Sequence, residues 1–146
     1  MAEKSFLDRA AEYTYKELER VGGDPSKLEV PLQTVAVLYS VQAIIDNGGF
    51  QYLFENDFPF SPPYSTFSDA YRRIGASQDA ERLDKAVAMF PFESPHLHQQ
   101  KRLDFMEFLE EDHEFFELGN QVCGDEAVWA ALEEYATKNA ILFRVM

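Results

Sequence analysis

Three histidines and one cysteine are the residues best suited to metal binding or nucleophilic catalysis in this sequence. His96 and His98 are two positions apart, so on a helix they point in different directions, and His113 is distant from both. No recognised metal-ligand spacing results. A cysteine nucleophile would need a histidine converging on Cys123, which lies in an expected loop before Gly124. The pattern therefore predicts no catalytic residue, no metal site and no cofactor.

Carboxylates are far more abundant, with 26 Asp and Glu residues against 13 Lys and Arg and a net charge of −13. They concentrate in residues 103–137, which contain 11 acidic residues and no basic one. Surfaces that serve only solubility usually mix both signs, so this separation favours a binding role. The candidate partner-binding residues are Asp104, Glu107, Glu110, Glu111, Asp112, Glu114, Glu117, Asp125, Glu126, Glu133 and Glu134.

The first part of this acidic segment forms a row at helical spacing. Asp104, Glu107, Glu111, Glu114 and Glu117 are separated by three or four positions, within a helix expected over residues 94–117. Side chains at this spacing lie ~5 to 6 Å apart on one face of a helix. Neighbouring phosphates of a nucleic-acid strand have a spacing of the same order. The sequence therefore predicts a carboxylate face that imitates phosphates, with the apolar residues between the acids pointing to the opposite side.

The elements that position these groups are all predicted to be helices. A helix that is apolar on nearly every side is expected over residues 31–46; it should be buried and end at Asn47-Gly48-Gly49. Amphipathic patterns predict further helices over residues 3–21, 66–74, 77–90, 94–117 and 125–143, and a short aromatic helix or turn after Gly49. No alternating pattern of strand length is present. We expect an all-α fold, a single domain over residues 1–146 with about five to seven helices around the apolar one.

The segment after the apolar helix carries the most specific motif of the chain. It consists of Asn47, Gly48, Gly49, Phe50, Gln51, Phe54 and Asn56, and is followed by Ile74-Gly75-Ala76 and Phe90-Pro91. In these elements residues 30–110 resemble a family of small acidic all-helical proteins of unknown function that includes DNA-mimic members. The resemblance implies acidic mimicry of duplex DNA. One difference is that Gln51 directly follows Phe50, where many members place one residue between them.

The motif residues themselves are interpreted as structural. Gly48 or Gly49 permits a positive φ, and the aromatic side chains that follow can fold back against the apolar helix. The sites that would imitate DNA are the carboxylates, which are not part of the motif.

Charge and cysteine content limit the partners and the compartment. A strongly negative protein repels phosphate backbones and anionic lipid headgroups, so direct binding to nucleic acid or to a membrane is not expected. Residues 30–45 are the most apolar run, yet they are shorter than a membrane span and include polar residues. A single cysteine and a charged N-terminal segment without an export signal favour the cytoplasm.

The principal hypothesis is an acidic binding protein without enzymatic activity, whose partner is a basic DNA-binding protein such as a transcriptional regulator. Three alternatives stay open. The first is an immunity-type inhibitor of a basic nuclease. The second is an enzyme with a site near residues 47–64, where Asn47, Gln51, Tyr52 and Asn56 would surround a polar pocket. The third is a helical domain whose acidic residues serve solubility alone. The sequence leaves a homodimer open.

Overall fold

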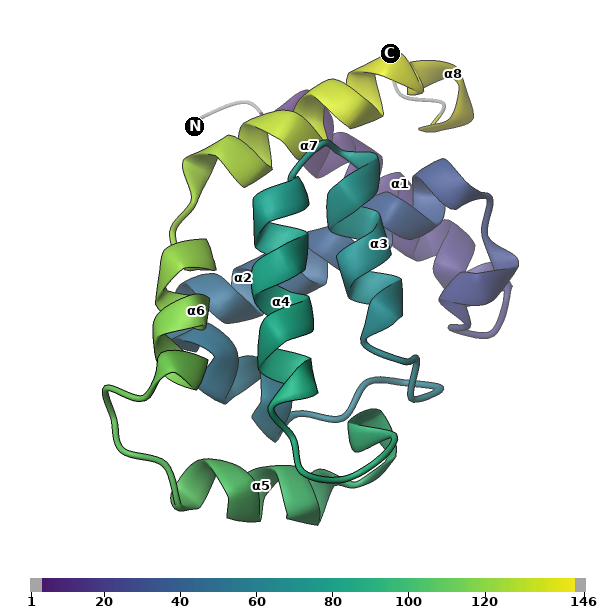
Figure 1. Ribbon diagram of the computed structural model, residues 1–146. Helices are drawn as coiled ribbons and strands as arrows, with labels where there is room; N and C mark the ends of the chain where they lie inside the picture. Colours follow the sequence, from purple (N-terminus) through teal and green to yellow (C-terminus); the bar gives the residue numbers. More distant parts are fainter. Residues whose placement is uncertain (1–3, 144–146) are drawn as a thin grey trace.

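The computed structural model describes residues 4–143, in which eight α-helices and two short 3₁₀ turns follow one another without a strand (Figure 1). The helices are α1 (Phe6–Arg20), α2 (Val30–Glu55), α3 (Ser65–Arg73), α4 (Ser77–Ala88), α5 (Gln99–Glu107), α6 (Glu114–Val122), α7 (Glu126–Lys138) and α8 (Ala140–Phe143). The 3₁₀ turns are η1 (Pro25–Lys27) and η2 (Pro95–Leu97). The predicted all-α class is confirmed. Residue 3, the expected start of the first helix, lies outside the described residues.

Helix α2 runs through the middle of the fold and packs against α1, α3, α5, α6 and α7 (Figure 1). Its apolar residues point to every side, and Val35, Leu38, Val41 and Ile45 are each at most 1% exposed. A helix that is apolar all round is stable only when other elements cover all of it. The prediction of a buried apolar helix is confirmed.

The glycine pair after this apolar part bends α2 where the sequence predicted its end. Gly48 and Gly49 have non-helical backbone angles, and Gly49 has φ 65° and ψ −157°, a combination that is essentially restricted to glycine. After the bend the chain resumes a helix as far as Glu55. The predicted stop is therefore a kink, because the residues that follow it bury Phe50 and Phe54 rather than leaving the core.

An aromatic cluster joins the second half of α2 to the elements around it. The Phe54 ring lies 5.1 Å from the Phe90 ring and 5.4 Å from the Phe115 ring, measured between centroids. Phe105 of α5 lies 5.5 Å from Phe115 of α6. Edge-on and tilted contacts at these distances add to the stabilisation that burial alone gives. The cluster fixes α5 and α6 against the end of α2.

The single helix predicted over residues 94–117 is wrong, because the chain forms η2, α5 and α6 with a turn between the last two. In a continuous helix, ten residues would separate Phe105 from Phe115 by about 15 Å along the axis. Their rings are in fact 5.5 Å apart, which requires the chain to turn back on itself. His113 starts the new helix, since its Nδ1 accepts a hydrogen bond from the Phe115 N–H at 3.0 Å. Burial of aromatic rings outweighs the helical periodicity of the acids.

The predicted helix over residues 125–143 is also divided, into α7 and α8. Asp125 caps α7 by accepting a hydrogen bond from the Ala127 N–H at 3.0 Å. Asn139 ends it, with its side-chain amide donating to the Tyr135 carbonyl at 2.8 Å. These two divisions raise the helix count above the predicted five to seven.

Candidate functional site

The predicted acidic residues follow one edge of the molecule. Residues 104–126 run along α5, through the turn at the lower left of Figure 1, up α6 and into the start of α7. Nine of the eleven candidate residues are exposed, and Asp125 and Glu133 are half-buried. We define the acidic flank as the seven exposed residues on α5, α6 and the turn between them. They are Asp104, Glu107, Glu110, Glu111, Asp112, Glu114 and Glu117.

The predicted row of carboxylates on one helix face does not exist as a single row. Asp104 and Glu107 belong to α5, Glu111 lies in the turn, and Glu114 and Glu117 belong to α6. Spacing at three positions is kept only within each helix. The flank is therefore two short carboxylate pairs joined by an acidic turn, and its shape is set by how α5 and α6 pack.

Few positive groups neutralise these carboxylates. Among the described residues, only one of the eleven candidates forms an ion pair. It is Glu134, whose carboxylate lies 3.2 Å from the Lys138 ammonium. Asp104 instead accepts a hydrogen bond from the neutral Gln100 amide at 2.9 Å. Lys101, one turn earlier on α5, has its ammonium 5.7 Å from the Phe92 ring centroid. The flank thus carries its charge uncompensated over most of its length.

One polar groove of about 390 Å³ between α4 and α6 does bring bases close to the flank. Arg82 and Lys85 line it together with Glu114 and Glu117. Arg82 is paired with Asp79 at 2.7 Å. The α6 end of the flank therefore faces mixed charge, whereas the end of α5 and the turn carry acids alone.

The sequence motif that carried the family resemblance has a structural role in the described residues. The amides of Asn47 and Asn56 donate to the carbonyls of Ala43 and Tyr52, at 2.9 and 2.6 Å. Gln51 donates to the Glu55 carboxylate at 2.9 Å. The three amides are therefore hydrogen-bonded to groups of α2 itself.

Close packing explains the glycine at position 119. A Cβ added to Gly119 of α6 would lie 2.7 Å from both the Phe50 ring and the Phe50 nitrogen. Contacts that short do not occur, so α6 can approach α2 this closely only with glycine at position 119. Together with the bend at Gly49, this contact sets the position of α6 and of its carboxylates.

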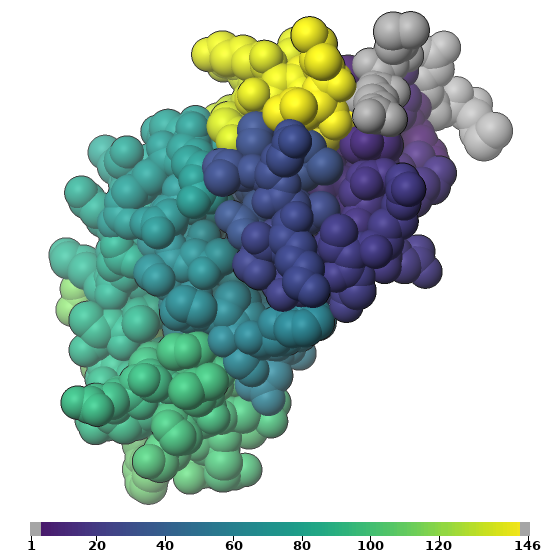
Figure 2. Space-filling model, turned by 90° about the vertical axis from the view of Figure 1, so that its right-hand side faces the viewer, coloured from purple at the N-terminus to yellow at the C-terminus, as the bar shows by residue number. Residues whose placement is uncertain are grey.

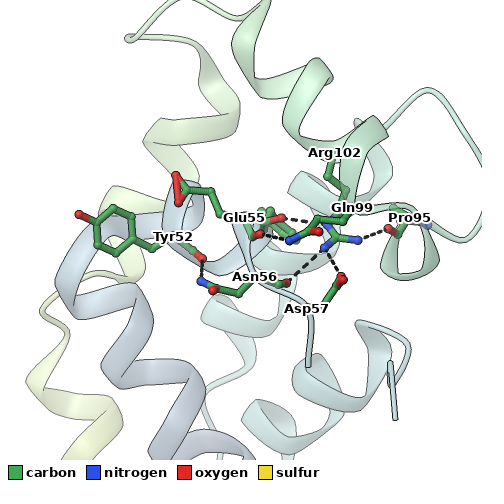
Figure 3. A network of polar contacts seen from close by, with 8 residues as sticks. Tyr52, Glu55, Asn56, Asp57, Pro95, Gln99 and Arg102 are labelled. Carbon is green, nitrogen blue, oxygen red and sulfur yellow. Dashed lines mark hydrogen bonds and ion pairs between the residues drawn. The ribbon is translucent and has the colours of Figure 1, made fainter. Parts of the chain in front are cut away.

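Sequence reasoning did not identify Arg102, which is completely buried at the end of α2 (Figure 3). Its Nε donates to the Phe54 carbonyl at 2.9 Å, and its Nη1 donates to the Pro95 carbonyl at 2.8 Å. Its Nη2 donates to the Asn56 carbonyl at 3.2 Å and to the Asp57 carboxylate at 2.7 Å. A cation at a helix C-terminus interacts favourably with the helix dipole and satisfies carbonyls that the helix leaves unpaired.

Gln99 continues this arrangement, since its amide donates to the Glu55 carbonyl at 2.8 Å (Figure 3). Two side chains of α5 thus hold the end of α2 and fix where α5 begins. The signal in the sequence was faint. Arg102 lies three and four positions before Phe105 and Met106, and so belongs to the apolar face of its helix.

A second, partly buried network positions the start of α7. The Asp46 carboxylate accepts hydrogen bonds from Trp129 Nε1 at 2.8 Å, from the Gly124 N–H at 2.7 Å and from the Gln42 amide at 2.7 Å. Gln42 in turn accepts from the Tyr71 hydroxyl at 2.7 Å. Burial raises the pKa of Tyr71, so its hydroxyl stays protonated and donates.

A carboxylate pair lies behind the flank. Asp79 of α4 is 4% exposed, and burial raises its pKa above the ordinary value. The Arg82 guanidinium opposes this shift, while the neighbouring Asp125 carboxylate adds to it. Burial and the neighbouring Asp125 carboxylate together hold the pKa of Asp79 above its ordinary value.

The three histidines and the cysteine, the residues best suited to metal binding or catalysis, lie in different parts of the fold. The His96 and His98 rings lie beside Tyr64 and Phe92, and the Cys123 thiol donates to the Asp46 carbonyl at 3.5 Å. Across residues 4–143, no group of three or more His, Cys, Asp or Glu side chains could hold a metal ion. Over the same residues, none of the helices has the length and apolar character that crossing a membrane requires.

Comparison with known proteins gives one finding. A family model described as DMP19-like protein matches residues 26–139, which span α2 to α7 and include the whole acidic flank. No curated protein and no solved structure matches the chain.

Proposed function

This chain belongs to the DMP19-like protein family, and we propose that it is an acidic binding protein that acts as a DNA mimic. In this proposal the acidic flank occupies the basic surface with which a DNA-binding protein, such as a transcriptional regulator, contacts phosphates. The proposal assigns the protein no catalytic role. It places the protein in the cytoplasm, where a single reduced cysteine is stable.

The observation that supports this proposal is the separation of charge on the surface. All seven residues of the acidic flank are exposed, and none is in an ion pair among the described residues. The ion pairs elsewhere join bases to acids outside the flank, as Arg102 does with Asp57 and Arg72 with Asp84. Uncompensated charge on one side attracts a partner of opposite sign and raises its association rate.

The family motif supports the same proposal indirectly. Its glycines bend α2 at Gly49, and its aromatic residues Phe50 and Phe54 pack against α6 and the aromatic cluster. These contacts decide where α5 and α6 lie. The motif contains no carboxylate of the acidic flank, but its packing contacts determine where those carboxylates lie on the surface.

The turn between α5 and α6 is the centre of the proposed surface. Glu110, Glu111 and Asp112 are consecutive and exposed, and Glu107 precedes them at the end of α5. The mixed-charge groove beside Glu114 would face a basic partner less favourably. We therefore expect the turn to contribute most to binding.

The experiment is capture of partners on the immobilised protein from a native lysate, with and without excess duplex DNA. Partners retained by the proposed mechanism are DNA-binding proteins, are displaced by the duplex and are lost as salt rises. Their identity separates a transcriptional regulator from a basic nuclease. The purified partner is then titrated against two triple variants.

The test variant carries Glu107→Lys, Glu111→Lys and Glu114→Lys. The matched control carries Glu19→Lys, Glu29→Lys and Glu93→Lys, three exposed acids outside the flank, so both variants change the net charge equally. We expect the test variant to lose binding at least tenfold more than the control. Equal loss in both variants, or binding that neither salt nor duplex DNA weakens, would overturn the proposal.

A further inference from the structure

A pocket of about 580 Å³ lies between α1, α2, α3 and the loops that follow α1 and α2. Figure 2 faces this side of the molecule, where α1 in purple borders the residues after it in navy and the loop after α2 lies below them. No residue of the acidic flank lines the pocket. The volume is within the range of cavities that hold one small organic molecule.

The walls of the pocket are mainly apolar. Leu18, Val37, Phe58 and Phe67 contribute aliphatic and aromatic surface, and three prolines of the loop at 58–63 contribute their rings. The Phe58 and Phe67 rings are in edge contact with centroids 4.9 Å apart. Such a lining favours a ligand with a ring over an extended polar one.

The rim of the pocket is held in an unusual conformation. Phe60 and Ser61 have φ 68° and 41°, which non-glycine residues rarely adopt. The Phe60 ring is 63% exposed and lies at the rim, where a Cβ added to Gly23 would be 3.7 Å from it. Prolines on both sides of these residues restrict the loop, so the pocket exists before any ligand binds.

The polar groups inside the pocket are neutral hydroxyls and amides. The Tyr15 hydroxyl donates to the Ala36 carbonyl at 3.1 Å and is bonded to the Ser40 hydroxyl. The charged residue among those lining the pocket is Asp24, whose carboxylate accepts from the N–H and hydroxyl of Ser26. An acid and no base in the lining, on a protein of net charge −13, disfavours an anionic ligand.

We propose that this pocket binds an uncharged, predominantly apolar small molecule with a planar ring. The ring lies between the loop prolines and the Phe58 and Phe67 side chains, and a polar group of the ligand hydrogen-bonds to the Tyr15 or Ser40 hydroxyl. The site is separate from the acidic flank and does not depend on the function proposed for it.

The test is a fluorescence titration of the full chain with Nile red, an uncharged planar dye. The test variant is Thr66→Trp, in which an indole on α3 fills the pocket. The matched control is Ser65→Trp, an exposed neighbour that does not line the pocket. Phe60→Ala serves as a second variant, because truncation of an exposed rim residue leaves the core intact. Circular dichroism verifies that each variant is folded.

We expect Thr66→Trp to weaken dye binding at least tenfold, Phe60→Ala to weaken it severalfold, and Ser65→Trp to change it by less than twofold. Anilinonaphthalene sulfonate, a dye with a negative charge, is expected to bind at least tenfold more weakly than Nile red. In NMR spectra of the protein, Nile red is expected to shift the backbone amide signals of residues 15–41 and 58–67. Equal binding by the two tryptophan variants, equal affinity for the two dyes, or shifts confined to other residues would overturn the proposal.

Discussion

Replacement of Arg102 by methionine is the sharpest test of how α5 is held. The arginine side chain is fully buried and donates hydrogen bonds to the carbonyls of Phe54, Asn56 and Pro95. Methionine has a similar length and helix propensity, so the change removes the guanidinium without leaving a large cavity. The three carbonyls then lose their charged donor.

The expected loss follows from these bonds rather than from the ion pair. The Asp57 side chain is 54% exposed, so its pairing with Arg102 contributes only ~0 to 1 kcal/mol. An unsatisfied buried carbonyl costs about 1 to 3 kcal/mol. The hydrogen bond to Phe54 is buried, whereas those to Pro95 and Asn56 are partly buried and cost less to lose, and the three losses are not fully additive. We expect Arg102→Met to lower the free energy of unfolding by about 2 to 5 kcal/mol, because the carbonyls of Phe54, Asn56 and Pro95 lose their donor.

Urea unfolding followed by circular dichroism measures this loss. Lys101→Met is the matched control, since Lys101 is its exposed neighbour on the same helix and is expected to change the free energy by less than about 0.5 kcal/mol. Arg102→Lys is expected to fall between the two, because an ammonium cannot reproduce the planar fork of donors. A loss below about 1 kcal/mol for Arg102→Met would refute the argument that this residue holds α5 to α2.

Three further predictions concern single positions. Gly49→Ala should lower the free energy of unfolding by at least about 1 to 3 kcal/mol, because its backbone angles are nearly exclusive to glycine. Gly75→Asn is the control, at φ 86° with open space around it, and should be nearly neutral. Urea unfolding measures both variants, and equal losses would contradict the argument. Gly119→Ala should destabilise the protein, because the added methyl group would overlap with Phe50. The overlap costs about 1 to 3 kcal/mol and exceeds the gain in helix propensity of about 1 kcal/mol. A higher melting temperature for this variant would contradict the prediction. For Asp79 the folded-state pKa is raised above 3.8, so the native state binds the proton more tightly and stability falls as pH rises above that value. The free energy of unfolding of Asp79→Asn, relative to the parent protein in urea melts, should therefore rise with pH from about 3.8 upward, and a flat or falling difference would refute it.

Local sequence patterns predicted the helices whose burial follows directly from the spacing of their own apolar residues. The apolar run of α2 has polar residues too sparsely placed to face solvent, so a buried helix was the consistent interpretation. The glycine pair was harder to interpret. Gly48 and Gly49 permit either a helix end or a bend, and the choice depends on Phe50 finding space against Gly119, about 70 residues later in the chain.

The candidate site illustrates the same limit. The regular spacing of acids from Asp104 to Glu117 predicted one helix, but the decisive contact is between Phe105 and Phe115, which no periodic pattern reveals. Nine of the eleven candidate carboxylates are exposed, which could be expected from the sequence because charged side chains are rarely buried. Their arrangement in space depends on Arg102 and the aromatic cluster, whose partners are distant in the sequence.

Negative charges at the two ends of the acidic flank affect the stability of the fold differently. This difference allows an effect on stability to be distinguished from an effect on binding. Glu114 and Glu117 lie in the first turn of α6, where negative charge is stabilised by the helix dipole by about 0.3 to 1 kcal/mol each. Glu107 ends α5, where the dipole opposes negative charge and Asp104 repels it from three positions away. The α6 acids therefore contribute to stability without a partner, whereas the end of α5 and the turn at Glu110–Asp112 gain nothing from the fold.

Single reversals should consequently move stability in opposite directions. At low salt, Glu107→Lys should raise the free energy of unfolding by about 0.3 to 1 kcal/mol and Glu114→Lys should lower it by a similar amount, measured by urea unfolding. On the proposed function, Glu107→Lys should nonetheless weaken partner binding at least as much as Glu114→Lys. A protein stabilised by Glu107→Lys that still binds its partner unchanged would show that the end of α5 is not part of the binding surface. A protein destabilised by that change would mean that the dipole argument itself is wrong.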